Sequence, residues 1–313
     1  ALTQFFWDPE FGGLFWTVDR FGRPVESRKQ VYAQAFGIYA LSEYSLACGQ
    51  PEGLEWARKL LYLLEASPHD RQYGGYVEGC DQRWQVLADS PLSEKEPYCR
   101  KSMNTLLHVL EAYTNLLRAW RDPLLEACLR ELLEIFLHQV IDPVDAHLRL
   151  FFDDDWTAFP GPLSYGHEIE ASWLLVESTG VLGDPMLQAS ARQSALALAE
   201  RVYEQGRDQD GSIFYEGSLA GIENDEKHWW VQAEGVVGFY NAYQLSGQPR
   251  YAQAAWQCWM FIEDHLVDRV HGEWFKVADR KGRPKQDQVK AGPWECPYHH
   301  SRTTLEMIRR LSE

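Results

Sequence analysis

The feature that most constrains the fold of this 313-residue chain is an internal repeat. One order of segments recurs along it: a short stretch rich in Asp, Gly and aromatic residues, then two helical patterns, except in the last unit, which has room for one. Turn residues between alternating aromatics predict that each short stretch is a hairpin. Helix pairs repeated at this length are typical of a helical solenoid or a closed α/α barrel. An aspartate anchors each copy, at steps of 62, 72, 66 and 60 residues: Asp8, Asp70, Asp142, Asp208 and Asp268.

The two helices of each pair differ in pattern. The first carries polar and aromatic residues near its N-terminal end and apolar residues after them, whereas the second shows an ordinary amphipathic stripe. In an α/α barrel the first helix of a pair lines the inside and the second covers it, so we expect the first helices to be the inner ones. The expected helices span 29–49, 52–66, 101–121, 123–138, 165–181, 185–204, 228–246, 248–265 and 298–312.

Composition narrows the class of partner. A net charge of −16 argues against nucleic acid and anionic membranes, and no run of 18 apolar residues is present. The 13 Trp, 15 Tyr and 14 Phe suit a small-molecule site for sugars, whose C–H-rich faces stack on indole rings. Six scattered cysteines form no C-x-x-C motif, which excludes a zinc knuckle or redox pair and favours a reduced, cytoplasmic protein.

Chemically capable side chains recur at the repeat period, near the starts of the expected inner helices. Successive steps from His108 to His167, Trp230 and His299 are 59, 63 and 69 residues. If the inner helices begin at a common rim, these side chains converge on the mouth of one cavity. The members of this set are Asn104, His108, His167, Glu170, Trp229, Trp230, Glu234 and His299.

The segment SYGHEIEASW, residues 164–173, raises the question of a metal. A zinc motif H-E-x-x-H would need a second histidine where Ala171 stands, and no paired Glu-x-x-His motif is present, so we expect no metal. The i, i+3 spacing of His167 and Glu170 places a carboxylate beside an imidazole, as in a tuned general base or in a buried structural pair. The acidic loop 153–155 lacks the glycine and distal glutamate of an EF-hand, so we expect a hairpin tip.

Six blocks spread over the chain resemble the N-acylglucosamine 2-epimerase superfamily and, within it, the cellobiose 2-epimerases. The resemblance implies an (α/α)6 barrel with one catalytic domain over residues 1–313. It also implies interconversion of the C2 epimers of reducing β-1,4-linked disaccharides such as cellobiose and lactose, without metal or cofactor. The matching blocks are KQVYAQAFGIYALSEYSLACG, KSMNTLLHVLEAYTNLLRAW, SYGHEIEASWLL, KHWWVQAEGVVGFYNAYQLSG, GEWF and PWECPYHHSR.

The resemblance also implies site residues. His167 and His299 resemble the acid/base pair of the superfamily, and Glu170 resembles the carboxylate that supports His167. His108 resembles the histidine that assists ring opening. The positions that resemble sugar contacts are Asn104, Tyr32, Glu96, Trp230 and Trp294.

The chain departs from the superfamily pattern in three places. Leu106 replaces a histidine, and His300 replaces an asparagine beside His299. Superfamily members also carry three helices before the FWDPEFGG block, and we expect that this segment has been omitted from the sequence. An open barrel, or completion by another chain, are the alternatives. With only nine of the twelve helices that a closed six-unit barrel needs, the helix 298–312 would lack a partner, and its apolar flanks would be bare.

Other functions remain open at this stage. Within the superfamily, a mannose isomerase, mannose 2-epimerase or N-acylglucosamine 2-epimerase would use the same histidines. A glycoside hydrolase or lyase would need two carboxylates facing across the cleft. An inactive sugar-binding remnant would keep the tryptophans without turnover. We expect a small sugar as the only partner and a monomer or homodimer.

Overall fold

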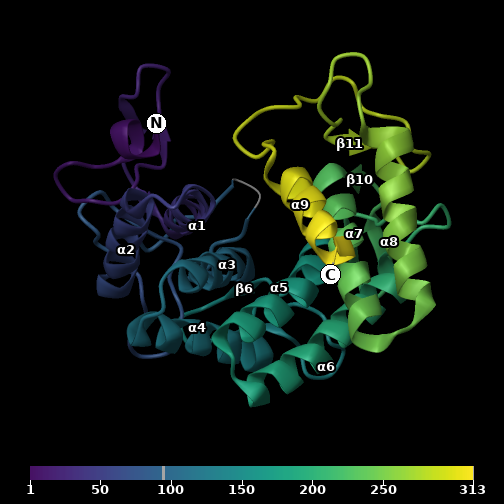
Figure 1. Cartoon of the computed structure of the whole chain (residues 1–313), viewed down its shortest axis with the longest axis horizontal. Helices are drawn as coiled ribbons and strands as arrows, with labels where there is room; N and C mark the ends of the chain where they lie inside the picture. Colours follow the sequence, from purple (N-terminus) through teal and green to yellow (C-terminus); the bar gives the residue numbers. More distant parts are fainter. Residues whose placement is uncertain (94–95, 313) are drawn as a thin grey trace. The chain divides into compact units, whose positions relative to one another are not determined.

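A computed structural model describes residues 1–93 and 96–312 of the chain (Figure 1). Glu94, Lys95 and Glu313 lie outside that description. The chain divides into two compact units, each described by itself below. Unit 1 comprises Ala1–Ile141, Arg149–Gly161 and Glu177–Gln188, and unit 2 comprises Asp142–Leu148, Pro162–Val176 and Ala189–Glu313.

The structure is mostly helical, and every helix expected from the pattern is confirmed with ends within four residues. Three of the second helices are shorter than expected because each finishes in a π-helical turn. The α-helices are α1 Val31–Cys48, α2 Pro51–Ala66, α3 Met103–Ala119, α4 Pro123–Ile135, α5 Tyr165–Leu182, α6 Pro185–Arg201, α7 Trp229–Ser246, α8 Pro249–Phe261 and α9 Tyr298–Ser312. The π-helical turns are η1 Leu2–Phe6, η2 Phe136–Val140, η3 Val202–Gly206 and η4 Ile262–Leu266.

Short antiparallel ladders join the starts of four inner helices, α1, α3, α5 and α7, to the hairpin of the next repeat. The pairs are β3 with β4, β5 with β6, β7 with β8 and β10 with β11. Residues 29–30, 101–102 and 228 were expected to be helical, which was wrong because their backbone groups pair with these hairpins. The strands are β1 Thr17–Val18, β2 Pro24–Glu26, β3 Lys29–Gln30, β4 Gly79–Cys80, β5 Lys101–Ser102, β6 Phe151–Phe152, β7 Leu163–Ser164, β8 Glu216–Ser218, β9 Gly221–Asn224, β10 Lys227–His228 and β11 Val277–Ala278.

The anchoring aspartates form the same turn in all five repeats, which confirms the repeat read from the sequence. The backbone N–H of each aspartate bonds to the carbonyl four or five residues later, at 2.8–2.9 Å. In three repeats the aspartate also forms an ion pair with a fully buried lysine, which lies on the strand before the inner helix. These ion pairs are Lys29–Asp8 at 2.8 Å, Lys101–Asp70 at 2.7 Å and Lys227–Asp208 at 2.9 Å.

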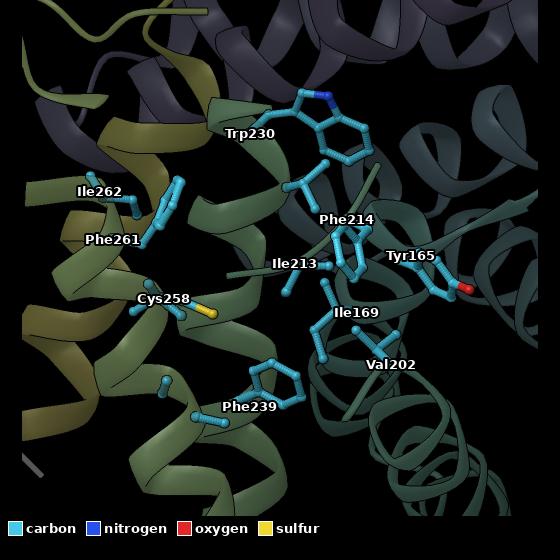
Figure 2. Packing of buried hydrophobic residues seen from close by; sticks show 14 of the residues in the cluster. Tyr165, Ile169, Val202, Ile213, Phe214, Trp230, Phe239, Cys258, Phe261 and Ile262 are labelled. Carbon is cyan, nitrogen blue, oxygen red and sulfur yellow. The ribbon is translucent and has the colours of Figure 1, made fainter. Parts of the chain in front are cut away.

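Burial marks α3 and α7 as inner helices, as the pattern predicts, whereas α1 and α9, which were also expected to be inner helices, are buried over only part of their surface. In unit 1, α3 packs against α1 and α4 (Figure 1). It is buried on nearly all sides, whereas α4 buries one face. In unit 2, α7 is buried in the same way and packs against α8 and α9. Figure 2 shows the unit 2 core, where Ile169 of α5, Phe239 of α7 and Phe261 of α8 belong to one apolar cluster.

The last helix, α9, packs against α7 along one face and exposes an apolar stripe. Leu305, Ile308 and Leu311 are 68%, 60% and 67% exposed. The expected bare flank of this helix is therefore confirmed. None of the described helices is both long and apolar enough to cross a membrane.

A partly buried ion-pair network in unit 1 gives a first testable expectation. His69 Nε2 lies 2.8 Å from Glu131 and its Nδ1 lies 3.7 Å from Glu65, and the Glu131 hydrogen bond raises the pKa of His69 against the effect of burial. A raised pKa means that the pair stabilises the fold fully below the unfolded pKa of His, about 6.5, and progressively less as pH rises through the folded pKa. His69→Gln should therefore lower the free energy of unfolding more at pH 6 than at pH 9.

The expected loss at pH 6 is about 1 kcal/mol, since the Glu131 carboxylate is 38% exposed and screened by water. Urea unfolding of the wild type and of His69→Gln at the two pH values measures it. His138→Gln, at an exposed histidine of the same unit, is the control. An equal loss at pH 6 and pH 9 would contradict the role of the charged imidazole.

Candidate active site

Two of the candidate histidines contact the same tryptophan in unit 2. The imidazole of His167 lies 4.9 Å from the Trp230 ring between centroids, and that of His299 lies 5.4 Å from it. Trp230 is the second residue of α7 and is buried. The structure therefore brings together three of the predicted site residues, from α5, α7 and α9.

His167 is oriented by the residues around the start of α5. Its Nδ1 lies 2.7 Å from the hydroxyl of Ser164, the last residue of β7. The preceding residue, Gly166, is needed for the close packing of Trp230, because a Cβ there would lie 2.4 Å from the indole ring. In the SYGH motif, Ser164 thus forms a hydrogen bond with Nδ1 of His167, and Gly166 leaves room for the Trp230 indole beside the imidazole.

His299 is oriented by a carboxylate from α7. Its Nδ1 lies 2.8 Å from Oε1 of Glu234, and the other oxygen of Glu234 accepts a hydrogen bond from the Trp173 indole at 2.9 Å. Glu234 is fully buried, and burial alone would favour its neutral form. The charges of Arg302 and His299 outweigh burial and lower the pKa of Glu234 to about 2, so it is a carboxylate at neutral pH.

Glu170, the predicted partner of His167, accepts a hydrogen bond from Arg302 at 2.6 Å. The same guanidinium nitrogen also donates to Glu234 at 2.6 Å. Ligand atoms of Glu170, Glu234 and His299 lie within 4.8 Å of one another, an arrangement that can hold a metal ion. Here the guanidinium supplies positive charge to both carboxylates, so these residues fit an arginine-neutralised cluster better than a divalent site.

Trp294 lies in the loop before α9 and is 41% exposed. Ion pairs on both sides of it tie this loop to the preceding hairpin. Lys290 lies 2.5 Å from Asp268, and Glu295 pairs with Lys276. The loop thus presents an indole from a segment that is fixed by charge rather than by regular structure.

The remaining predicted residues belong to unit 1. His108 on α3 lies 5.0 Å from the ring of Tyr32 and 4.8 Å from that of Phe36, both on α1, and its Nδ1 lies 3.1 Å from Glu111. Asn104 stands one turn before His108, and its buried Oδ1 accepts no hydrogen bond from the residues that the structure describes. Tyr32, Asn104 and His108 therefore form a second group of site candidates within unit 1.

Glu96, predicted to contact sugar, lies in the loop before β5. Its Oε2 accepts a hydrogen bond from the Leu92 backbone at 2.8 Å, and burial raises the pKa of its carboxyl. Nearby, the acidic loop is a hairpin tip, as expected: Arg100 bonds to Asp154 at 3.0 Å and Lys101 bonds to the Asp154 carbonyl at 2.7 Å. Protein cations thus hold this loop.

Sequence reasoning gave no role to Arg302, Ser164 or Trp173, and named Glu234 only as a member of the recurring set. A positional signal could have found Glu234. It is the sixth residue of its inner helix, as His108, Glu170 and Phe36 are of theirs. Residues two and six of a helix are four apart and share a face, so both positions point the same way.

The site thus lies in a mostly helical fold of paired helices, which bring two oriented imidazoles against one buried indole, an arrangement that can exchange protons with a bound molecule. The model of one family, N-acylglucosamine 2-epimerase (GlcNAc 2-epimerase), matches residues 1–302 of the chain. The chain therefore belongs to the N-acylglucosamine 2-epimerase family.

Similar proteins agree with this assignment. A cellobiose 2-epimerase from Bacteroides fragilis is 44% identical over 308 residues, which cover 98% of this chain and 78% of that enzyme. One from Dictyoglomus turgidum is 38% identical over 311 residues, 99% of this chain and 79% of that enzyme. The solved structure of a cellobiose 2-epimerase from Bacillus thermoamylovorans matches with a TM-score of 0.92 at 37% identity, covering 99% of this chain and 79% of that one.

Proposed function

We propose that the protein is a sugar 2-epimerase that interconverts the C2 epimers of reducing β-1,4-linked disaccharides of the cellobiose and lactose type. The observation that carries this proposal is the pair of imidazoles, His167 and His299, in contact with Trp230. Epimerisation at C2 needs two proton-transfer groups that serve opposite faces of one carbon. Two oriented histidines around a sugar-stacking indole meet that need.

The reaction requires an open-chain sugar, because the proton at C2 becomes acidic only when C1 is a carbonyl. One imidazole removes that proton as a base, and the electron pair moves onto the C1 oxygen to give an enediolate. The other imidazole, as imidazolium, delivers a proton to the opposite face of C2 and regenerates the aldose with inverted configuration. With Nδ1 of each ring engaged by Ser164 or Glu234, Nε2 is the nitrogen that exchanges the proton.

The other predicted residues take supporting roles in this proposal. His108, with Asn104 beside it, assists ring opening by moving a proton between the ring oxygen and the anomeric hydroxyl. Tyr32, Glu96 and Trp294 contact the sugar rings, and the indole of Trp294 suits the second ring of a disaccharide. Glu170 supports the acid/base group, acting with Arg302 on the charge of the cluster.

Finer properties of the molecule belong to the same proposal. The helix pairs and hairpin ladders support an (α/α)6 barrel that acts as a single catalytic domain over residues 1–313. The apolar stripe of α9 is proposed to pack against a further helix of that barrel. The enzyme is proposed to use no metal or cofactor and to act as a monomer or homodimer. All six cysteines are free, which supports a cytoplasmic location.

Incubation with cellobiose, lactose or mannose in D2O, followed by NMR of the products, tests the function. We expect the C2 epimer of a disaccharide with deuterium at C2, and full activity after dialysis against EDTA. Released glucose would instead identify a hydrolase, and exclusive turnover of mannose would identify a mannose-specific enzyme. Saturable binding without turnover would identify a binding protein. Activity lost on EDTA treatment and restored by a divalent ion would contradict the metal-free chemistry.

A further inference from the structure

Arg302 joins two carboxylates that come from different inner helices. Its Nη2 donates to Glu170 on α5 and to Glu234 on α7, both at 2.6 Å. Both glutamates are fully buried, and the Arg302 side chain is 6% exposed. Ion pairs this far from water are weakly screened, so removal of one partner has a large effect.

Aromatic rings hold the guanidinium in place. Its carbon lies 4.9 Å from the Trp173 ring and 4.3 Å from the Tyr298 ring, and Nη1 bonds to the Tyr298 hydroxyl. Arginine suits this position because its planar group stacks on rings while its fork reaches two acceptors, which a lysine ammonium does not reproduce. The orientation of Arg302 is therefore set before any substrate binds.

The positive charge of Arg302 determines whether Glu170 and Glu234 can both be ionised. Two neighbouring buried carboxylates cannot both stay ionised without a compensating charge, and one would otherwise take up a proton. A protonated Glu234 would lose its role as the charged acceptor for Nδ1 of His299. With Arg302 present, the two carboxylates and the guanidinium together carry one negative charge. Protonated His299 balances that charge, so the group of four side chains is then neutral.

We propose that Arg302 is a positioning residue of the acid/base site. It keeps Glu170 and Glu234 ionised and side by side, and through Glu234 it holds His299 in the orientation that transfers the proton. This inference rests on the proposed epimerase function and adds to it the residue that couples the two carboxylates. Among the residues that the structure describes, the titratable and charged groups around His299 include Glu170, Glu234, Tyr298 and Arg302.

The test compares Arg302→Met and Arg302→Lys with the wild type, using Arg309→Met as a matched control. Arg309 lies on the same helix and pairs with Glu306 at the surface. We expect kcat of Arg302→Met to fall about 100-fold, the size of one proton-transfer contribution, with KM changed less. Arg302→Lys should recover at least about 10-fold of that loss, since it restores the charge but not the fork. Arg309→Met should match the wild type.

Two readouts separate positioning from a merely structural role. The acidic limb of the kcat/KM profile of Arg302→Met should move up by about one pH unit, because the loss of a nearby cation raises the pKa of an imidazolium and of the carboxylates. In D2O, one of the two epimers should still gain deuterium at C2 without inversion, since His167 remains in place. If Arg302→Met is unstable, the one-sided exchange, smaller in size, is expected of Arg302→Lys, whose retained positive charge should leave the acidic limb close to that of the wild type.

The possible outcomes are distinct. A wild type that does not epimerise refutes the proposed function itself. A wild type that epimerises, together with an Arg302→Met enzyme that has the same pH profile and the same ratio of exchange to inversion, refutes the positioning role alone. A loss confined to KM refutes it as well.

Discussion

His299→Asn should lower kcat for epimerisation by about 1,000-fold or more in both directions while leaving the fold intact. Asparagine keeps a polar amide near Glu234 but cannot take or give a proton at neutral pH, and one proton-transfer group contributes about 100- to 10,000-fold. The remaining base, His167, still faces one side of C2. The epimer whose C2 proton lies on that side should therefore exchange it for deuterium without inversion.

His167→Asn should likewise lose epimerisation, but the other epimer of the pair should be the one that still exchanges its C2 proton for deuterium. NMR of each epimer, incubated separately in D2O with each variant, measures both outcomes. The matched control is His300→Asn, next in sequence to His299 but paired with Glu273 at 3.1 Å and in tilted ring contact with Trp274; it should keep most of the activity. If both histidine variants retain near-wild-type turnover, or lose exchange from both epimers equally, the assignment of two bases to two faces is wrong.

The sequence could predict these histidines because the repeat fixes their phase. The second residues of four inner helices are Tyr32, Asn104, Trp230 and His299, and His167 is the third residue of the remaining one. Once the repeat is recognised, local periodicity alone indicates which side chains share a face with these positions. The same reasoning predicted that α3 and α7 are buried and that α4 and α8 bury one face, since a buried helix and a half-buried helix differ in pattern.

The partners of these histidines could not be predicted in the same way. Glu234 meets His299 across 65 residues of sequence, and Arg302 meets Glu170 across 132. Such contacts depend on how three helices pack, which no local pattern encodes. The i, i+3 spacing drew attention to Glu170 as the partner of His167, yet a serine at Ser164 supplies the hydrogen bond to Nδ1. The strands that directly precede the inner helices were missed for a related reason, because their pairing partners lie in the next repeat.

Lys101→Met should destabilise unit 1 by about 3 kcal/mol or more, the usual cost of removing one partner from a buried ion pair. The ammonium of Lys101 is fully buried and donates to Asp70 at 2.7 Å and to the carbonyls of Gly74 and Asp154 at 2.9 and 2.7 Å. Removing it leaves a carboxylate and two carbonyls without their donor. Urea unfolding at neutral pH, followed by circular dichroism, measures the loss.

The repeat itself indicates how that loss should be recovered. The third repeat has Leu163 on the strand where others have lysine, although its aspartate turn is intact, so the turn does not require the ammonium as such. Adding Asp70→Asn to Lys101→Met removes the uncompensated charge and should restore at least about 1 kcal/mol. Lys59→Met, at an exposed lysine of unit 1, should change stability by less than about 0.5 kcal/mol. A double variant no more stable than Lys101→Met would show that the three hydrogen bonds, rather than the buried charge of Asp70, hold the turn.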